Sequence, residues 1–225
     1  MVTGKQSTPM SRRNFLGYAS AFAGAAAIIT SAACKKDDDM PMSGSGIDLG
    51  SGDVGILNYA YALEQLEAAF YIQVANTPYT GITATEAALL RDIRDHEIAH
   101  REFFKKALGS NAIADLEVNF SSIQFNNRDS VLGTAKAFED LGVAAYNGAG
   151  KLITSPDYLL LAGKIVSVEA RHAALIRDLI SNGSFADMTV VDANGLEISK
   201  APGDVLMAAS SFLKSKINAS NLPTT

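Results

Sequence analysis

The chain has 225 residues, of which 48% are hydrophobic, and its formal net charge at pH 7 is −5. That length suffices for one sizeable domain with extensions. Residues 1–33 contain three basic side chains and no acidic one, so the remainder has 16 basic and 24 acidic residues and a net charge of −8. An acidic chain without a basic stripe argues against a nucleic-acid partner. The single cysteine, Cys34, excludes an internal disulfide framework and a cysteine-based metal cluster.

Residues 1–34 have the pattern of an export signal. The sequence Ser11-Arg12-Arg13-Asn14-Phe15-Leu16 is similar to the twin-arginine motif, and an Ala-rich apolar run follows to about residue 30. That run is shorter than the roughly 20 apolar residues of a transmembrane helix. Small residues before Cys34 are typical of a lipoprotein cleavage site, although Ser31 stands where a large aliphatic residue is usual. Ordinary signal cleavage or an uncleaved anchor remain alternatives.

These features predict export through the twin-arginine route and a periplasmic or cell-envelope location. A lipid on Cys34 would then anchor the protein to a membrane. The polar residues 35–52, rich in Ser and Gly after a short charged run, are expected to form a flexible linker between the anchor and a folded domain.

Four stretches repeat apolar residues with a period near 3.6, which predicts four helices. The first is expected to begin at Asp53 as N-cap, the second at Thr83 or Thr85, and the fourth at Ser155 followed by Pro156. A long connection separates the second helix from the third. The expected helices span about 53–75, 83–108, 130–153 and 155–182.

Two Glu-x-x-His steps stand out on these helices, Glu97-Ile98-Ala99-His100 and Glu169-Ala170-Arg171-His172. Residues three apart share a helix face, so each step directs a carboxylate and an imidazole to one place. The chain has three histidines, and two of them belong to these steps. The third, His96, is turned by about 100° from the stripe and is expected at the surface.

The other two helices repeat a different pattern. Glu64 is followed by Tyr71 seven residues later, and Glu139 by Tyr146 at the same spacing. The chain therefore reads as two similar helix pairs. Glu67 is a rival to Glu64, but its counterpart in the other pair is a glycine that cannot bind a metal, which favours Glu64.

Four carboxylates and two imidazoles on inward faces are costly to bury unless something neutralises them. Two divalent cations balance four carboxylates in formal charge. Tyr71 and Tyr146 are expected either to hydrogen-bond these carboxylates or to serve as core aromatics. The expected metal ligands are Glu64, Glu97, His100, Glu139, Glu169 and His172.

One Glu from each of two helices and a Glu-x-x-His step from each of the other two is the arrangement of di-iron and di-manganese bundles. Residues 53–183 therefore resemble the ferritin-like superfamily, an all-α fold with an antiparallel four-helix bundle. The export signal adds a looser similarity to exported members of the rubrerythrin and desiccation-related type.

The resemblance implies two iron or manganese ions and an oxidoreductase that handles peroxide or oxygen, or that oxidises iron(II). It identifies no further catalytic residue. The alternative is a metal-binding structural or stress-protective envelope protein with little catalysis. Iron storage is disfavoured, because a lipid tether and a C-terminal extension suit a closed cage poorly.

Residues 184–225 differ in character from the bundle. Apolar residues 188–191 and 196–198 flank Asp192-Ala193-Asn194-Gly195, which predicts a hairpin-like turn. A fifth helix is expected from Pro202 to about Ile217. Its apolar face would pack on the bundle or on a second subunit, which leaves a homodimer open.

Overall fold

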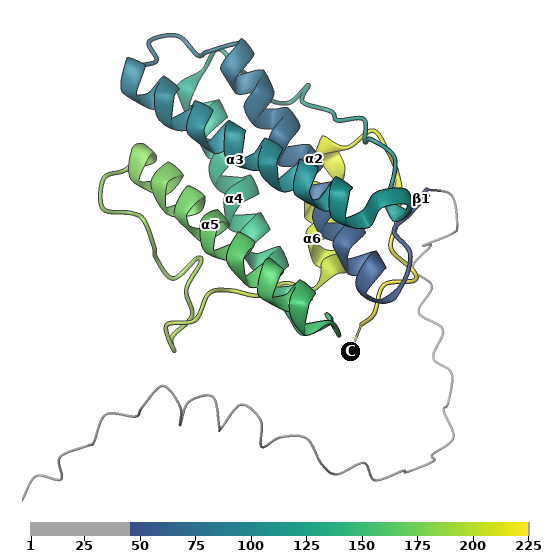
Figure 1. The fold of residues 1–225 in the computed structure, drawn as a ribbon. Coiled ribbons are helices and arrows are strands. Elements are labelled where there is room, and N and C mark those ends of the chain that lie inside the picture. The colour runs from purple at the N-terminus through teal and green to yellow at the C-terminus, as the bar shows by residue number, and fades with distance from the viewer. Residues whose placement is uncertain (1–45, 225) are drawn as a thin grey trace, which may run out of the picture. The chain divides into compact units, whose positions relative to one another are not determined.

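The computed structural model describes residues 46–224 (Figure 1). The twin-arginine motif and Cys34 lie outside the described residues, so export and lipid anchoring stay predictions from the sequence. None of the helices in the described part is both long and apolar enough to cross a membrane. Its elements are β1 (Ile47–Asp48), α2 (Gly52–Asn76), α3 (Ala84–Leu108), η1 (Gly109–Asn111), α4 (Arg128–Gly150), α5 (Pro156–Ile180), α6 (Pro202–Ala209), η2 (Ser210–Phe212) and β2 (Ile217–Asn218).

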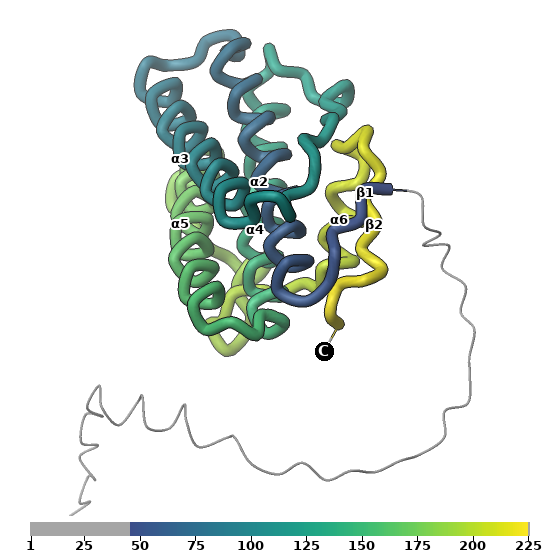
Figure 2. Tube along the Cα trace, turned by 45° about the vertical axis from the view of Figure 1, so that its right-hand side comes forward, coloured from purple at the N-terminus to yellow at the C-terminus, as the bar shows by residue number. Residues whose placement is uncertain are grey.

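Helices α2 to α5 form the predicted bundle (Figures 1 and 2). Helix α2 packs along α3, and α4 packs along α5, each pair being joined by a short connection. Residues 112–127 form the long connection from α3 to α4, which lets the second pair pack against the first. An all-α, ferritin-like bundle with a C-terminal extension and a fifth helix is thus the fold.

Several helix ends follow the predicted chemistry. Thr83 caps α3 with a capping box, in which its hydroxyl accepts from the Glu86 amide at 3.1 Å. Gly109 ends α3 with φ of 55°. Ser155 is the N-cap of α5 with Pro156 in the first turn. Helix α4 begins at Arg128, two residues before the predicted start, because Asn127 caps it by accepting from the Ser130 amide.

The prediction that Asp53 caps α2 is wrong. The helix begins at Gly52, and Asp53 lies in its first turn. Its carboxylate instead accepts hydrogen bonds from the amides of Thr154 and Ser155 at 2.7 and 2.8 Å, and one from the Thr154 hydroxyl. Asp53 therefore fastens the α4–α5 connection to the start of α2.

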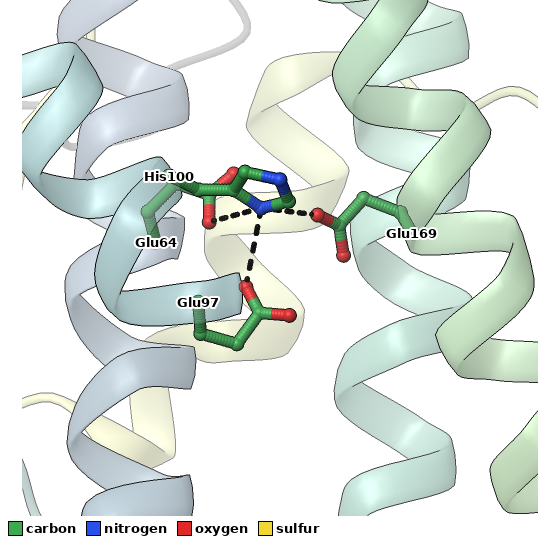
Figure 3. Close-up of side chains that lie close together, drawn as sticks. All are labelled: Glu64, Glu97, His100 and Glu169. Carbon is green, nitrogen blue, oxygen red and sulfur yellow. Dashed lines mark ion pairs between the residues drawn. The ribbon is translucent and has the colours of Figure 1, made fainter. Parts of the chain in front are cut away.

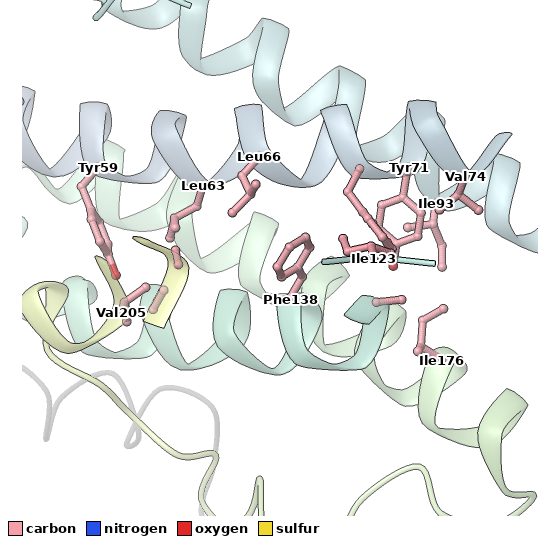
Figure 4. Packing of buried hydrophobic residues seen from close by; sticks show 14 of the residues in the cluster. Tyr59, Leu63, Leu66, Tyr71, Val74, Ile93, Ile123, Phe138, Ile176 and Val205 are labelled. Carbon is pink, nitrogen blue, oxygen red and sulfur yellow. The ribbon is translucent and has the colours of Figure 1, made fainter. Parts of the chain in front are cut away.

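The main hydrophobic core lies between α2, α4 and the segments that cover them (Figure 4). Phe70 is fully buried and makes edge-to-face contacts with Tyr71 and Phe138. The α3–α4 connection adds Phe120 and Phe125 to the same cluster. Helix α2 is therefore buried along most of its length, whereas α3 and α5 keep an exposed outer face.

Strand β1 pairs in parallel with β2, with Ile47 opposite Ile217. The Ile47 amide donates to the Lys216 carbonyl at 2.8 Å, and the Leu49 amide to the Asn218 carbonyl at 3.1 Å. Residues 47–52, which the sequence assigns to the flexible linker 35–52, are therefore part of the fold. A strand of two residues is too short to produce a recognisable sequence periodicity.

The C-terminal extension contains the predicted hairpin-like turn and a shorter fifth helix than expected. Val191 and Glu197 form an antiparallel bridge around the turn. Helix α6 ends at Ala209, eight residues before the predicted end at Ile217, which instead lies in β2.

Several contacts fasten the extension to the bundle, and those of Arg177 and Lys200 are the clearest. Arg177 on α5 is 2% exposed and donates to both carboxylate oxygens of Asp140 on α4, each at 2.8 Å. The same guanidinium also donates to Asp187 and Thr189 of the extension. Further along, the Lys200 amide donates to the Ala144 carbonyl at 3.0 Å. The extension is thus held on the bundle by charge-assisted hydrogen bonds of the buried Arg177 and by a backbone hydrogen bond to α4.

Candidate metal centre

The structure brings all six predicted ligand residues together in the middle of the bundle (Figure 3 shows four of them). Each of the four helices contributes at the same level, so the three-residue spacing of each Glu-x-x-His step does place both side chains inward. All four glutamates are fully buried, and His172 is 5% exposed. The contributing residues are Glu64 from α2, Glu97 and His100 from α3, Glu139 from α4, and Glu169 and His172 from α5.

The ligand atoms form two overlapping groups of four residues. In each group the atoms lie within 4.8 Å of one another. Glu97 and Glu169 belong to both groups, so these two carboxylates lie between them. Each group is completed by one further glutamate and one histidine. The groups are Glu64, Glu97, His100 and Glu169, and Glu97, Glu139, Glu169 and His172.

The contacts of the first group repeat in the second. Nδ1 of His100 lies 2.8 Å from Oε1 of Glu169, on the opposite helix pair. Nδ1 of His172 lies 2.7 Å from Oε1 of Glu97, again across the pairs. The sequence repeat of two helix pairs therefore becomes an approximate twofold relationship in space.

Tyr71 and Tyr146 hydrogen-bond carboxylates, one of the two roles that the sequence left open, and these bonds too cross between the helix pairs. Both tyrosines also pack in the buried core, which was the other role. The Tyr71 hydroxyl donates to Oε1 of Glu139 at 2.5 Å, and the Tyr146 hydroxyl donates to Oε1 of Glu64. Burial, reinforced by the nearby glutamates, raises the pKa of both phenols, so both remain protonated donors. One oxygen of Glu64 and one of Glu139 are thereby oriented, and the second oxygen of each forms no hydrogen bond.

The remaining polar atoms of the centre are close to one another but form no well-directed hydrogen bonds, although Nδ1 of His100 and Nδ1 of His172 each lie within 2.8 Å of a carboxylate oxygen. Among the described residues, eight buried oxygen and nitrogen atoms of the six ligand residues have no hydrogen-bond partner. Buried polar groups are normally satisfied, and each such exception needs a physical reason. One proton on Nδ1 of His100 cannot satisfy the three carboxylates that surround it within 3.6 Å. Divalent cations would satisfy all of these atoms at once, so the donor set fits metal ions.

The shifted pKa values of the metal-free chain also indicate that the cluster requires positive charge. Burial raises the pKa of Glu139 to about 8, and it raises the pKa of Glu64 as well. Burial also opposes the ionisation of Glu97, but His100 and His172 together lower its pKa to about 2. Against burial, the surrounding carboxylates raise the pKa of both histidines to about 12. Without metal, bound protons therefore offset the negative charge of the cluster.

Glu67, the rival ligand on α2, belongs to neither group. It is 4% exposed and lies against Gly142 on α4, where a Cβ atom would come within 3.1 Å of its Oε1. Glu67 lies three residues after Glu64, and Gly142 lies three residues after Glu139. The two positions are therefore equivalent in the two helix pairs and face each other across the approximate twofold axis. Burial raises the pKa of Glu67, and the charges of Glu97 and Glu169 raise it further. The glycine therefore makes room for a fifth buried carboxyl group beside the centre.

His96 is the residue whose contact the sequence does not predict. It is exposed, as expected, but its ring stacks on His172 with centroids 5.2 Å apart. Nδ1 of His96 lies 2.9 Å from Nε2 of His172, the nitrogen that faces away from the carboxylates. Metal-binding histidines usually donate this second N–H to a neighbour. The available signal was the position of His96, four residues before His100 and thus on an adjoining part of the α3 surface.

Comparison with known proteins supports the fold. No curated protein matches the chain. The family model described as ferritin-like domain matches residues 52–182, which is more than half of the chain and contains all six residues of the centre. The chain therefore belongs to the ferritin-like domain family.

Proposed function

We propose that the protein is a di-metal carboxylate protein that binds two iron or manganese ions. The supporting observation is the convergence, in two overlapping groups, of eight buried oxygen and nitrogen atoms that form no hydrogen bond. Glu97 and Glu169 would be shared by both ions, since they belong to both groups. Glu64 with His100, and Glu139 with His172, would complete one ion each. Carboxylate and imidazole ligands suit both metals.

We further propose that the protein is an oxidoreductase that reduces peroxide or oxygen, or oxidises iron(II). Two such ions, when bound, supply redox chemistry that amino-acid side chains lack. The chain contributes four fully buried glutamates and two tyrosines that orient Glu64 and Glu139. Glu67 adds a carboxyl group beside the centre whose raised pKa favours the protonated form.

The test of the metal centre is metal analysis of the purified protein, followed by loading with iron(II) or manganese(II). We expect about two metal ions per chain, as in other carboxylate bundles of this design. Glu97→Ala and His172→Ala should lower the metal content, because the first removes a shared ligand and the second a terminal one. Glu102→Ala is the matched control, since this glutamate is on the exposed side of α3. A parent protein that takes up neither metal would overturn the proposal.

Assays of peroxide loss, oxygen consumption and iron(II) oxidation test the reaction separately from the metal centre. Turnover by the loaded parent, lost in Glu97→Ala, is the expected result. Bound metal without turnover of any of these substrates would instead favour the metal-binding structural or stress-protective envelope protein.

The proposed location is outside the cytoplasm, with a lipid anchor on Cys34. Its support is the N-terminal sequence, with its paired arginines and the small residues before the lone cysteine. Replacement of Arg12 and Arg13 by lysine should retain the protein in the cytoplasm. Cys34→Ser should move it from the membrane fraction to the soluble fraction, and an unchanged distribution would contradict lipid anchoring.

A further inference from the structure

A cavity of about 210 Å³ lies between α4 and the C-terminal extension. Phe138 and Leu141 of α4 line one side of it. Thr189 and Glu197 from the hairpin-like turn, and Ala208 from α6, line the other. The family match ends at residue 182, so this second side is made by a part of the chain outside the matched domain.

A second, much smaller hollow of about 10 Å³ lies further in, between α2 and α4. Its walls include Leu63 and Leu66 of α2, and Glu67 and Gly142 lie at it as well. Phe138 and Leu141 line this hollow too, so the same two side chains separate it from the outer cavity. Its volume is close to that of one water-sized probe, which limits what it can hold to molecules of a few atoms.

The inner hollow adjoins the candidate metal centre through Glu67. The carboxyl group of Glu67 fills the space opposite Gly142, and these two residues lie one helical turn after the candidate ligands Glu64 and Glu139. Among the described residues no basic side chain forms an ion pair with it. A molecule in this hollow would therefore meet a polar group only at its inner end.

The C-terminal extension, which forms the outer wall of the larger cavity, is hydrogen-bonded to the bundle. Arg177 ties Asp140 on α4 to Asp187 and Thr189 of the extension. Lys200 is hydrogen-bonded to the Ala144 carbonyl, and a Cβ at Gly148 would overlap the Lys200 carbonyl oxygen. The extension can therefore approach α4 closely only because residue 148 is glycine.

We propose that the outer cavity and the inner hollow form an access route by which a small neutral oxidant, hydrogen peroxide or dioxygen, reaches the metal centre. Phe138 and Leu141 are the partition that it must pass, and Glu67 marks the inner end. The inference rests on the proposed function, since it presupposes a metal centre that reacts with such an oxidant.

The chemistry of the route selects a neutral molecule. A cation would lose its hydration between Phe138, Leu141 and the leucines of the inner hollow, at a cost that these apolar walls do not offset. An anion would face the same loss and would approach a cluster of carboxylates. Dioxygen is apolar, and hydrogen peroxide is uncharged and can exchange hydrogen bonds with the Glu67 carboxyl group.

Two substitutions obstruct the route at different depths. Ala208→Trp places a large ring in the outer cavity from α6, and Leu141→Trp enlarges the partition. Met207→Trp is the matched control, because Met207 precedes Ala208 on the same helix, is 63% exposed and does not line the cavity. None of the three residues is among the candidate metal ligands.

The experiment loads each full-length variant with iron(II), measures its metal content, and follows nitric oxide binding by stopped-flow spectroscopy. Nitric oxide is a neutral diatomic probe whose binding is independent of turnover. We expect unchanged metal content in all variants, and a second-order binding rate lowered by about tenfold in Leu141→Trp and by about threefold in Ala208→Trp. Met207→Trp should bind nitric oxide at the parent's rate.

The same iron(II)-loaded variants are then mixed with hydrogen peroxide and, separately, with dioxygen. The oxidant whose reaction is slowed in Leu141→Trp and Ala208→Trp is the one that uses the route. Nitric oxide binding at the parent's rate in both Leu141→Trp and Ala208→Trp would overturn the route while leaving the metal centre intact. A parent that takes up no iron would overturn the proposed function, and the route with it. Should Leu141→Trp fail to fold, Ala208→Trp at its open position on α6 decides the question alone.

Discussion

Glu67 on α2 and Gly142 on α4 occupy one space between them. A Cβ at residue 142 would lie 3.1 Å from Oε1 of Glu67 and 3.7 Å from Oε2. The two helix pairs repeat each other in sequence, and this position is where the repeat has to break, because the space holds only one carboxyl group. The glycine is therefore required by its partner and not by backbone conformation.

This relationship predicts different results for two Gly→Ala substitutions on α4. At Gly133 a Cβ would meet nothing within 4 Å. Gly133→Ala should therefore raise the free energy of unfolding by about 1 kcal/mol, the usual gain in helix propensity. Gly142→Ala should lack that gain, because crowding of a buried group costs about 1–3 kcal/mol. Denaturant unfolding of the metal-free variants measures both, and an equal stabilisation at the two positions would contradict the contact.

Tyr71 and Tyr146 each donate to a glutamate of the other helix pair, so their removal should lower metal affinity although every ligand remains. Tyr71→Phe removes the donor to Glu139, and Tyr146→Phe removes the donor to Glu64. Each substitution should weaken metal binding by about 10- to 100-fold, which is typical for partners that orient a ligand. Competition titrations with a chelator measure the affinities.

Tyr59→Phe is the control for these variants. Its hydroxyl is buried without a hydrogen-bond partner, so its removal should leave metal binding unchanged. Equal affinities in all three variants would show that the two hydrogen bonds do not support the centre.

The sequence could predict the centre because its pattern is local. Spacings of three and seven residues on a helix determine which side chains share a face, and the pairing of a Glu-only helix with a Glu-x-x-His helix occurs twice. These local rules placed all six candidate ligands, and Tyr71 and Tyr146 beside them.

The contacts that the sequence did not predict depend on distances between elements. Asp53 binds the α4–α5 connection about 100 residues later in the chain, and β1 pairs with β2 about 170 residues later. The contact between His96 and His172 depends on how closely α3 approaches α5. No periodicity encodes such distances, because they result from the packing of the whole bundle.

The metal-free protein should lose stability as the pH rises. The histidines of the centre have pKa values raised to about 12 in the folded chain, above the unfolded value of 6.5. Their contribution is complete below pH 6.5 and is lost as the pH rises towards 12. Glu139, raised from 4.5 to about 8, acts in the same direction between those two values. Denaturant unfolding at about pH 6 and about pH 9 should therefore show the lower stability at the higher pH.

Metal binding should reverse this trend. Ligand histidines must release their protons before they bind, so metal affinity rises with pH and binding releases protons. Calorimetric titration in buffers of different ionisation enthalpy counts those protons. Metal binding with no proton release near neutral pH would contradict the protonated state of the metal-free histidines.

The corrected position of Asp53 predicts a stability effect larger than that of an ordinary first-turn aspartate. Asp53→Ala removes three hydrogen bonds to Thr154 and Ser155. Because Asp53 and Ser155 are only partly buried and Thr154 is exposed, the expected loss in the free energy of unfolding is only about 1–2 kcal/mol. Asp157→Ala in the first turn of α5 is the control and should lose about 0.5 kcal/mol, the interaction with the helix dipole. Equal losses would mean that the Asp53 contacts contribute nothing.

The contact of His96 with His172 predicts that the two metal sites, one with His100 and one with His172, differ in metal affinity. Its Nδ1 can accept the Nε2–H of His172 at 2.9 Å, which would hold the His172 ring with Nδ1 towards the carboxylates. His96→Phe keeps an aromatic ring for stacking but removes the acceptor. It should weaken one of two metal-binding steps by about tenfold, the lower end of such effects, and leave the His100 half unchanged. Phe103→Leu, at an exposed position one turn after His100 on α3, should alter neither step. Equal weakening of both steps by His96→Phe would show that its effect is a general loosening of α3 and not the orientation of His172.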